Sequence, residues 1–106
     1  MKWIPREVPV CSTSVYTDYV LCTDGGRPLP AVVEEWSPHG VNGSLIRNNR
    51  TEHAPAGVPR WLPKVSGSVV SVLAKSPCYP MNIPTDLHAA QRMAEEELEL
   101  HWKNYL

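Results

Sequence analysis

The sequence predicts an α+β domain in which one C-terminal helix packs on a small, mostly antiparallel sheet of about three to five strands. Short runs of β-branched and aromatic residues, separated by glycines and prolines, occupy residues 1–75, whereas residues 85–106 are rich in good helix formers. Residues 76–84 contain three prolines and are expected to form a stiff linker between these parts. A chain of 106 residues corresponds to a single domain with one modest core.

The first predicted element is a β-hairpin. Val15–Cys22 (VYTDYVLC) is rich in residues that favour strands, and Thr23–Gly26 (TDGG) forms a turn signal because its glycines accept a positive φ. Ala31–Trp36 (AVVEEW) is expected to return as the second strand. Pro28 and Pro30 lie in the connection, where a missing N–H group does least harm.

The middle of the chain predicts shorter elements. Ser37–Ser44 is a loop by composition, and Leu45–Ile46 is expected to start a short third strand. A second loop is predicted at Thr51–Gly57, followed by a rigid extended segment at Val58–Pro63. Val65–Ala74 (VSGSVVSVLA) is predicted to be a strand because its valines alternate with small residues.

The last element is an amphipathic helix that starts at Thr85 or Asp86, either of which can cap it. Apolar residues recur at steps of three and four and form one stripe, which consists of Leu87, Ala90, Ala94, Leu98, Trp102 and Tyr105. Met93 and Leu100 lie off that stripe. They either widen the face that covers the sheet or contact a partner.

The charge composition excludes a polycation that binds nucleic acid with its whole surface, because the chain has 10 Lys and Arg residues and 11 Asp and Glu residues. They are unevenly spread, with a net +3 in residues 45–64 and a net −3 in residues 85–106. No apolar stretch is long enough to span a membrane, and the first residues lack the apolar region of a secretory signal. A cytoplasmic protein is therefore expected.

Motifs for catalysis and for cofactor binding are absent from the sequence, which has no G-x-S-x-G, no H-E-x-x-H and no glycine-rich phosphate loop. We therefore expect a protein that is not an enzyme and holds no cofactor. Cys11, Cys22 and Cys78 are widely spaced and form no C-x-x-C. Cys22 is read as a buried thiol, while a metal site made of the three cysteines and a histidine stays open, as does a nucleophile pair of Cys78 with a histidine.

Two candidate surfaces follow from these patterns. The first is a protein-binding surface that consists of Arg60, Trp61, Met93, Glu96 and Leu100. Trp61 is framed by prolines and an arginine, so it is either part of the core or an interface anchor, and Trp3 leaves the same alternative open. The second is a nucleic-acid-binding surface that consists of Arg47, Arg50, Arg60 and Lys64.

Three short motifs follow one another along the chain, namely Trp3–Pro5 (WIP), Tyr19–Cys22 (YVLC) before an Asp-Gly-Gly turn, and Arg60–Pro63 (RWLP). This order resembles a family of small phage- and prophage-encoded proteins of unknown function, which open with W-I-P or W-I-x-V, continue with a V-L-V strand and close on H-W-M-P-L-P. Arg60 stands where the family has histidine, and Lys64 follows where a further Leu-Pro is expected. The resemblance covers about residues 3–63 and offers no catalytic residues.

The resemblance implies a phage-encoded accessory protein in the cytoplasm of a bacterial host. Together with the missing catalytic motifs, it predicts a non-enzymatic protein that binds and modulates a host protein, with a second copy of the chain as another partner. The alternative is an accessory protein that binds nucleic acid through the basic 45–64 segment.

Overall fold

The computed structural model describes residues 1–11, 14–39, 44–47, 50–53, 60–79 and 81–101. Its main sheet is antiparallel with the strand order β1-β2-β3-β6-β7. These strands are β1 (Lys2–Cys11), β2 (Ser14–Cys22), β3 (Pro28–His39), β6 (Arg60–Val65) and β7 (Ser68–Val69). The far end of β3 continues into a second antiparallel ladder with β4 (Ser44–Arg47) and β5 (Arg50–His53). The helices are α1 (Ser71–Ala74) and α2 (Leu87–Leu100).

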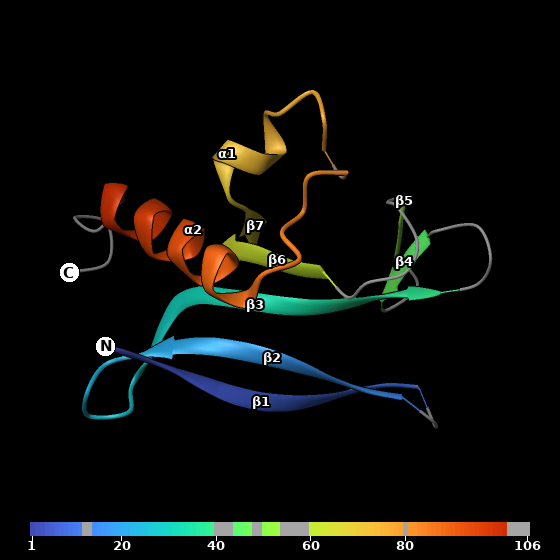
Figure 1. Ribbon diagram of the computed structural model, residues 1–106. Coiled ribbons are helices and arrows are strands. Elements are labelled where there is room, and N and C mark those ends of the chain that lie inside the picture. Colours follow the sequence, from blue (N-terminus) through green and yellow to red (C-terminus); the bar gives the residue numbers. More distant parts are fainter. Residues whose placement is uncertain (12–13, 40–43, 48–49, 54–59, 80, 102–106) are drawn as a thin grey trace.

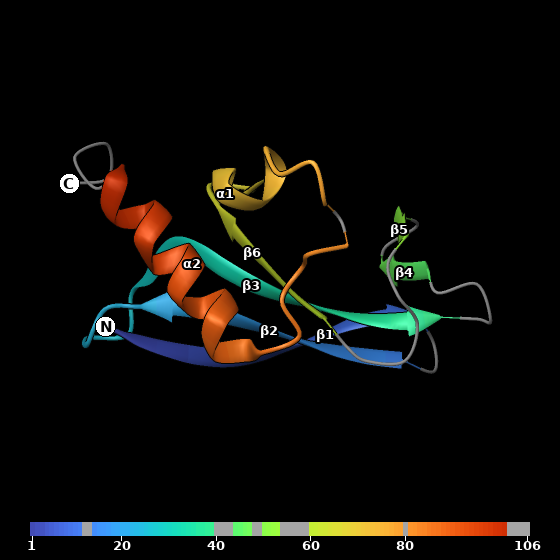
Figure 2. The same cartoon turned by 45° about the horizontal axis from the view of Figure 1, so that its top comes forward.

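The α+β class with a C-terminal helix on an antiparallel sheet is confirmed. Figures 1 and 2 show α2 lying across β3 and β6, while α1 lies beside the β6–β7 end of the sheet and β1 forms the opposite edge. The predicted hairpin corresponds to β2 and β3, which both extend beyond the predicted bounds. Pro28 and Pro30 lie in β3 and not in the connection, and the loop predicted at Ser37–Ser44 is wrong at both ends, which belong to β3 and β4. The short strand expected at residues 45–46 is part of β4. The loop expected at Thr51–Gly57 begins with residues of β5.

The strand register places one set of apolar residues on the face of the sheet that meets α2. Trp3 lies opposite Leu21, and Ala31 lies opposite Val65. Because side chains alternate between the two faces of a strand, these pairs and the neighbouring pair of Tyr19 with Val33 point the same way. Trp36 and Leu62, which pair with Arg60 and Glu34, point to the opposite face and are buried there. The buried core consists of Leu21, Ala31, Val33, Trp36, Leu62, Val65, Val70, Leu73, Ile83, Ala90, Ala94 and Leu98.

The apolar stripe of the helix is confirmed as far as the described residues extend. Ala90 and Ala94 are 0% exposed, and Leu98 is 2% exposed. Two alanines at the centre of the contact let the helix approach the sheet closely. Gln91 is also buried, which the stripe did not predict. Trp102 and Tyr105 lie outside the described residues.

The strand predicted at Val65–Ala74 is wrong. The backbone of Ser66 and Gly67 has φ angles of 53° and 82°, which form a two-residue turn that joins β6 to β7. Both central residues of such a turn need a positive φ, and a Ser-Gly pair tolerates it better than two valines would. After Val70 the chain turns into α1, so the valines of this segment belong to three different elements.

The segment expected to be a stiff linker, residues 76–84, is anchored to the sheet at its C-terminal end. Ile83 is 1% exposed and belongs to the core. The backbone N–H of Trp61 donates to the carbonyl of Pro84 at 2.8 Å, so this segment extends the hydrogen bonding along the edge of β6. Several turns, such as the one in which Met81 N–H donates to Cys78 O, fold the segment over the sheet. Its prolines limit the conformations that the packed segment loses on folding.

Candidate functional site

Arg60, which belongs to both predicted surfaces, is a buried residue at the start of β6 and is only 8% exposed. Its Nη1 donates to the carbonyl oxygen of Met81 at 2.9 Å and to that of Ile83 at 2.6 Å. Buried carbonyl oxygens need donors, and a guanidinium supplies several in a fixed geometry. Arg60 therefore ties the 76–84 segment to the sheet, and its guanidinium is directed into the protein.

Trp61 is half-buried and packs against the core. Its ring lies edge-on to that of Tyr19, with 5.7 Å between the ring centroids and 69° between the planes. This T-shaped arrangement is one that aromatic pairs favour. Trp61 therefore has a packing role, and its use as an interface anchor stays a prediction.

The α2 residues that were predicted to contact a partner lie near α1. Glu97 accepts a hydrogen bond from the backbone N–H of Ser71, which fixes the first turn of α1 beside α2. Met93 and Leu100, four residues before and three after Glu97, share its side of the helix. Met93 is half-buried against the core, whereas Leu100 is 79% exposed and Val72 on α1 is 65% exposed. We call Val72, Met93, Glu96 and Leu100 the helix seam.

The cations of the nucleic-acid alternative do not form a described patch. Lys64 is largely buried, with its Nζ 3.6 Å from Oε2 of Glu34. The same carboxylate accepts a hydrogen bond from Nε1 of Trp36 at 3.2 Å. The side chains of Arg47 and Arg50 lie outside the described residues. Of the four predicted cations, Arg60 and Lys64 are therefore engaged inside the protein.

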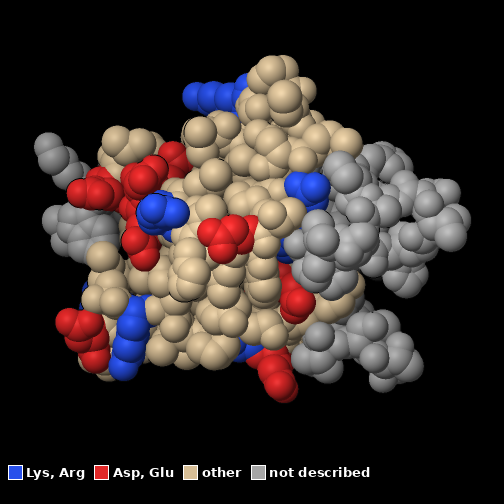
Figure 3. All heavy atoms as spheres, viewed as in Figure 1, with Lys and Arg blue, Asp and Glu red and all other residues tan. Residues whose placement is uncertain are grey.

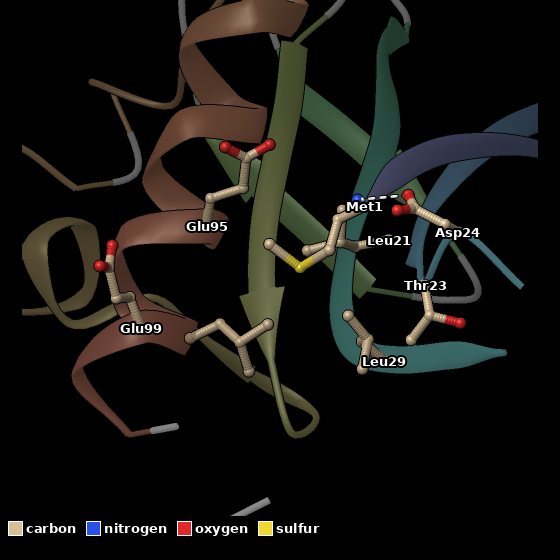
Figure 4. Close-up of a pocket in the computed structure, with 8 residues that line it drawn as sticks. Met1, Leu21, Thr23, Asp24, Leu29, Glu95 and Glu99 are labelled. Atoms are coloured by element: carbon tan, nitrogen blue, oxygen red, sulfur yellow. Dashed lines mark hydrogen bonds and ion pairs between the residues drawn. The ribbon is translucent and has the colours of Figure 1, made fainter. Parts of the chain in front are cut away.

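A cleft of about 610 Å³ opens on the other side of α2, toward the turn between β2 and β3. Its apolar part is formed by Leu21, Leu29 and Leu98. Figure 4 shows Glu95 and Glu99 along α2 on one side, and the β2–β3 residues across from them. The remaining lining residues are Met1, Thr23 and Asp24.

The rim of this cleft is acidic. Glu95 accepts a hydrogen bond from Nε1 of Trp3 at 2.7 Å, and because the indole carries no charge, this contact is not an ion pair. Asp24 accepts a hydrogen bond from the amino group of Met1 at 2.7 Å. That bond and the positive charge of the amino group lower the pKa of Asp24, so it is ionised at neutral pH. Figure 3 shows acidic side chains gathered at the end of the molecule where α2 terminates.

The cleft could not be predicted from the sequence. Its residues come from the first residue of the chain, β2, β3, α2 and the β2–β3 turn, and no spacing along the chain connects them. One signal was available, since Glu95 and Glu99 are four residues apart and therefore share a helix side. The sequence did not show that this side faces a gap beside β1 and β2.

Metal ligands and cysteines are the other chemical groups that could form a site. Among the described residues, no group of three His, Cys, Asp or Glu side chains is arranged to hold a metal ion. Cys22 is buried, as predicted, and Cys78 is exposed. The side chain of Cys11 lies outside the described residues. No helix in the described part of the chain has the length and apolar character needed to cross a membrane.

Comparison with known proteins gives no relative: no protein family, no curated protein and no solved structure matches this chain.

Proposed function

We propose that this protein is a non-enzymatic accessory protein that binds a host protein and modulates its activity, with the helix seam as its docking surface. The observation that carries the proposal is the exposure of Leu100 and Val72, at 79% and 65%, on the two helices that the Ser71–Glu97 hydrogen bond holds together. Aliphatic side chains on elements that are already ordered lose little conformational entropy on binding. The exposed carboxylate of Glu96 adds a charge that selects among partners.

The phage origin and the bacterial cytoplasm belong to the same proposal. They rest on the resemblance carried by the WIP, YVLC and RWLP motifs. The packing of Trp3 and Trp61 against the core is compatible with a structural role for the first and the last of these motifs. None of the three motifs contributes a residue to the helix seam.

The experiment is a pull-down of the tagged protein from nuclease-treated bacterial lysate, washed at low and at high salt. We expect one host protein to remain at near-equal stoichiometry with the wild type, because an apolar interface resists salt. Leu100→Ser should lose that protein. Met81→Gln is the matched control, since Met81 is an exposed apolar residue (49%) outside the helix seam and should leave binding unchanged.

Two outcomes would overturn the proposal. The first is equal retention of every captured protein by the wild type and by Leu100→Ser. The second is an empty high-salt lane together with nucleic acid recovered when nuclease is omitted, because phosphate binding falls steeply with salt. That second outcome would favour the basic 45–64 segment, with Arg47 and Arg50 as its first residues to substitute.

A further inference from the structure

We infer that the acidic cleft beside α2 receives an arginine side chain of the partner protein. The inference rests on the proposed function, because it names the chemistry by which that same partner is recognised. The helix seam and the cleft lie on opposite sides of α2, so a partner that straddles this helix reaches both.

The floor of the cleft suits the aliphatic part of a long cationic side chain. Met1, which is 65% exposed, and the half-buried Leu29 supply accessible apolar surface, while Leu21 and Leu98, at 1% and 2% exposure, lie beneath them. Arginine and lysine side chains lay their methylene groups on such surface and keep the charged end in a polar rim. A purely apolar side chain would leave the carboxylates of the rim without a partner.

The rim carries more negative than positive charge. Glu95, Glu99 and Asp24 line the cleft, as does Met1, whose amino group is already bound to Asp24. Lys2 lies near enough to help lower the pKa of Asp24 but does not line the cleft. Within the described residues, no lysine or arginine lines the cleft. Glu97, on the other side of the helix, is not part of this rim. Its carboxylate accepts a hydrogen bond from the N–H of Ser71 and lies 3.7 Å from Nε2 of His101.

The contact with Trp3 holds the Glu95 carboxylate in a fixed orientation, in which it can bind a cation. The indole N–H orients one carboxylate oxygen at 2.7 Å without neutralising the charge. Glu99 lies one helical turn further on, and its carboxylate points outward at the edge of the rim (Figure 4). A planar guanidinium has donors on several sides and can pair with a carboxylate through two parallel hydrogen bonds, whereas a lysine ammonium acts as a point charge. Because it is also weakly hydrated, arginine fits a charged rim above an apolar floor better than lysine.

The first test is an NMR titration of the ¹⁵N-labelled protein with acetyl-leucyl-arginyl-leucinamide, whose only charge is the guanidinium. We expect saturable shifts of backbone amides that line the cleft, among them Thr23, Asp24 and Glu99. The same tripeptide with citrulline in place of arginine keeps the shape and loses the charge, and it should bind about tenfold more weakly. Equal binding of the two peptides would overturn the inference, and so would shifts confined to other parts of the protein.

A pair of variants tests the carboxylate directly. Glu95→Gln keeps an acceptor for Trp3 and removes the charge, so it should preserve the fold and weaken arginine-peptide binding by about tenfold. Glu7→Gln makes the same chemical change at an exposed residue of β1 that belongs neither to the cleft nor to the helix seam. It should leave peptide affinity unchanged, and an equal loss in both variants would contradict a specific role for Glu95.

The pull-down separates this inference from the proposed function. If Leu100→Ser loses the host protein while Glu95→Gln retains it fully, the inference fails and the proposed function stands. If the wild type retains no protein and the arginine peptide still binds at the cleft, the proposed function fails and the preference of the cleft for arginine stands. Loss of the host protein in both variants supports both.

Discussion

Polar side chains in this protein join segments that are far apart in the sequence. Trp3 on β1 reaches Glu95 on α2, and Arg60 on β6 reaches the carbonyls of Met81 and Ile83. Each of these contacts spans a boundary between the sheet and the segment that covers it. Such bonds contribute modest stability when formed, but a buried partner left without its hydrogen bond is costly.

Substitution of Arg60 by methionine should therefore destabilise the protein although the side chain keeps its apolar length. Two carbonyl oxygens lose a charged donor, and we expect a loss of about 2–4 kcal/mol in the free energy of unfolding. Urea denaturation followed by tryptophan fluorescence measures this change. Arg92→Met is the control, because Arg92 is exposed on α2 and its loss should cost no more than about 0.5 kcal/mol. Similar values for both variants would contradict a structural role for Arg60.

At the scale of elements, local signals decide where α2 begins. The side chain of Asp86 accepts a hydrogen bond from the N–H of Ala89 at 3.2 Å, so Asp86 is the cap, while Pro84 precedes it. Thr85, the other predicted cap, has no such bond in this structure. The turn at Ser66 and Gly67 is a second local signal, and it divides a run of strand formers into two strands.

The cap can be tested by substitution. Asp86→Ala should lower the stability of the protein by about 1 kcal/mol, because the first turn of α2 loses its acceptor. The change is read from thermal unfolding followed by circular dichroism at 222 nm. Asp86→Asn retains a capping oxygen and should unfold close to the wild type. If Thr85→Ala lowers the midpoint as much as Asp86→Ala, the cap is misassigned.

At the scale of the whole molecule, the sheet has one long edge that is open within the described residues, and this edge is β1. Pro5 and Pro9 lie in it, opposite Tyr19 and Val15 of β2. Because proline has no N–H to donate to the ladder, the nitrogens of both residues face away from β2, toward the open edge. The outer edge of β1 therefore lacks two backbone N–H donors that could otherwise pair with a strand of another molecule.

Replacement of Pro5 by threonine restores one of those donors. We expect the variant to self-associate more than the wild type at high protein concentration, and analytical ultracentrifugation measures the change. Ile4→Thr is the control, because it alters the neighbouring residue of β1 without adding a donor at the edge. An unchanged sedimentation coefficient for Pro5→Thr would show that the edge is protected by other means.

What the sequence determined by itself are the features that depend on neighbours along the chain. The β2–β3 hairpin follows from strand formers on both sides of a glycine turn, and α2 follows from its cap and from apolar residues one turn apart, such as Ala90 and Ala94. The tertiary structure alone decided the buried position of Arg60, the contact of Trp3 with Glu95 and the acidic cleft. The physical reason is that burial and hydrogen bonding depend on which segments lie next to each other in space. No local sequence pattern predicts that residue 60 contacts residue 83, or that residue 3 contacts residue 95.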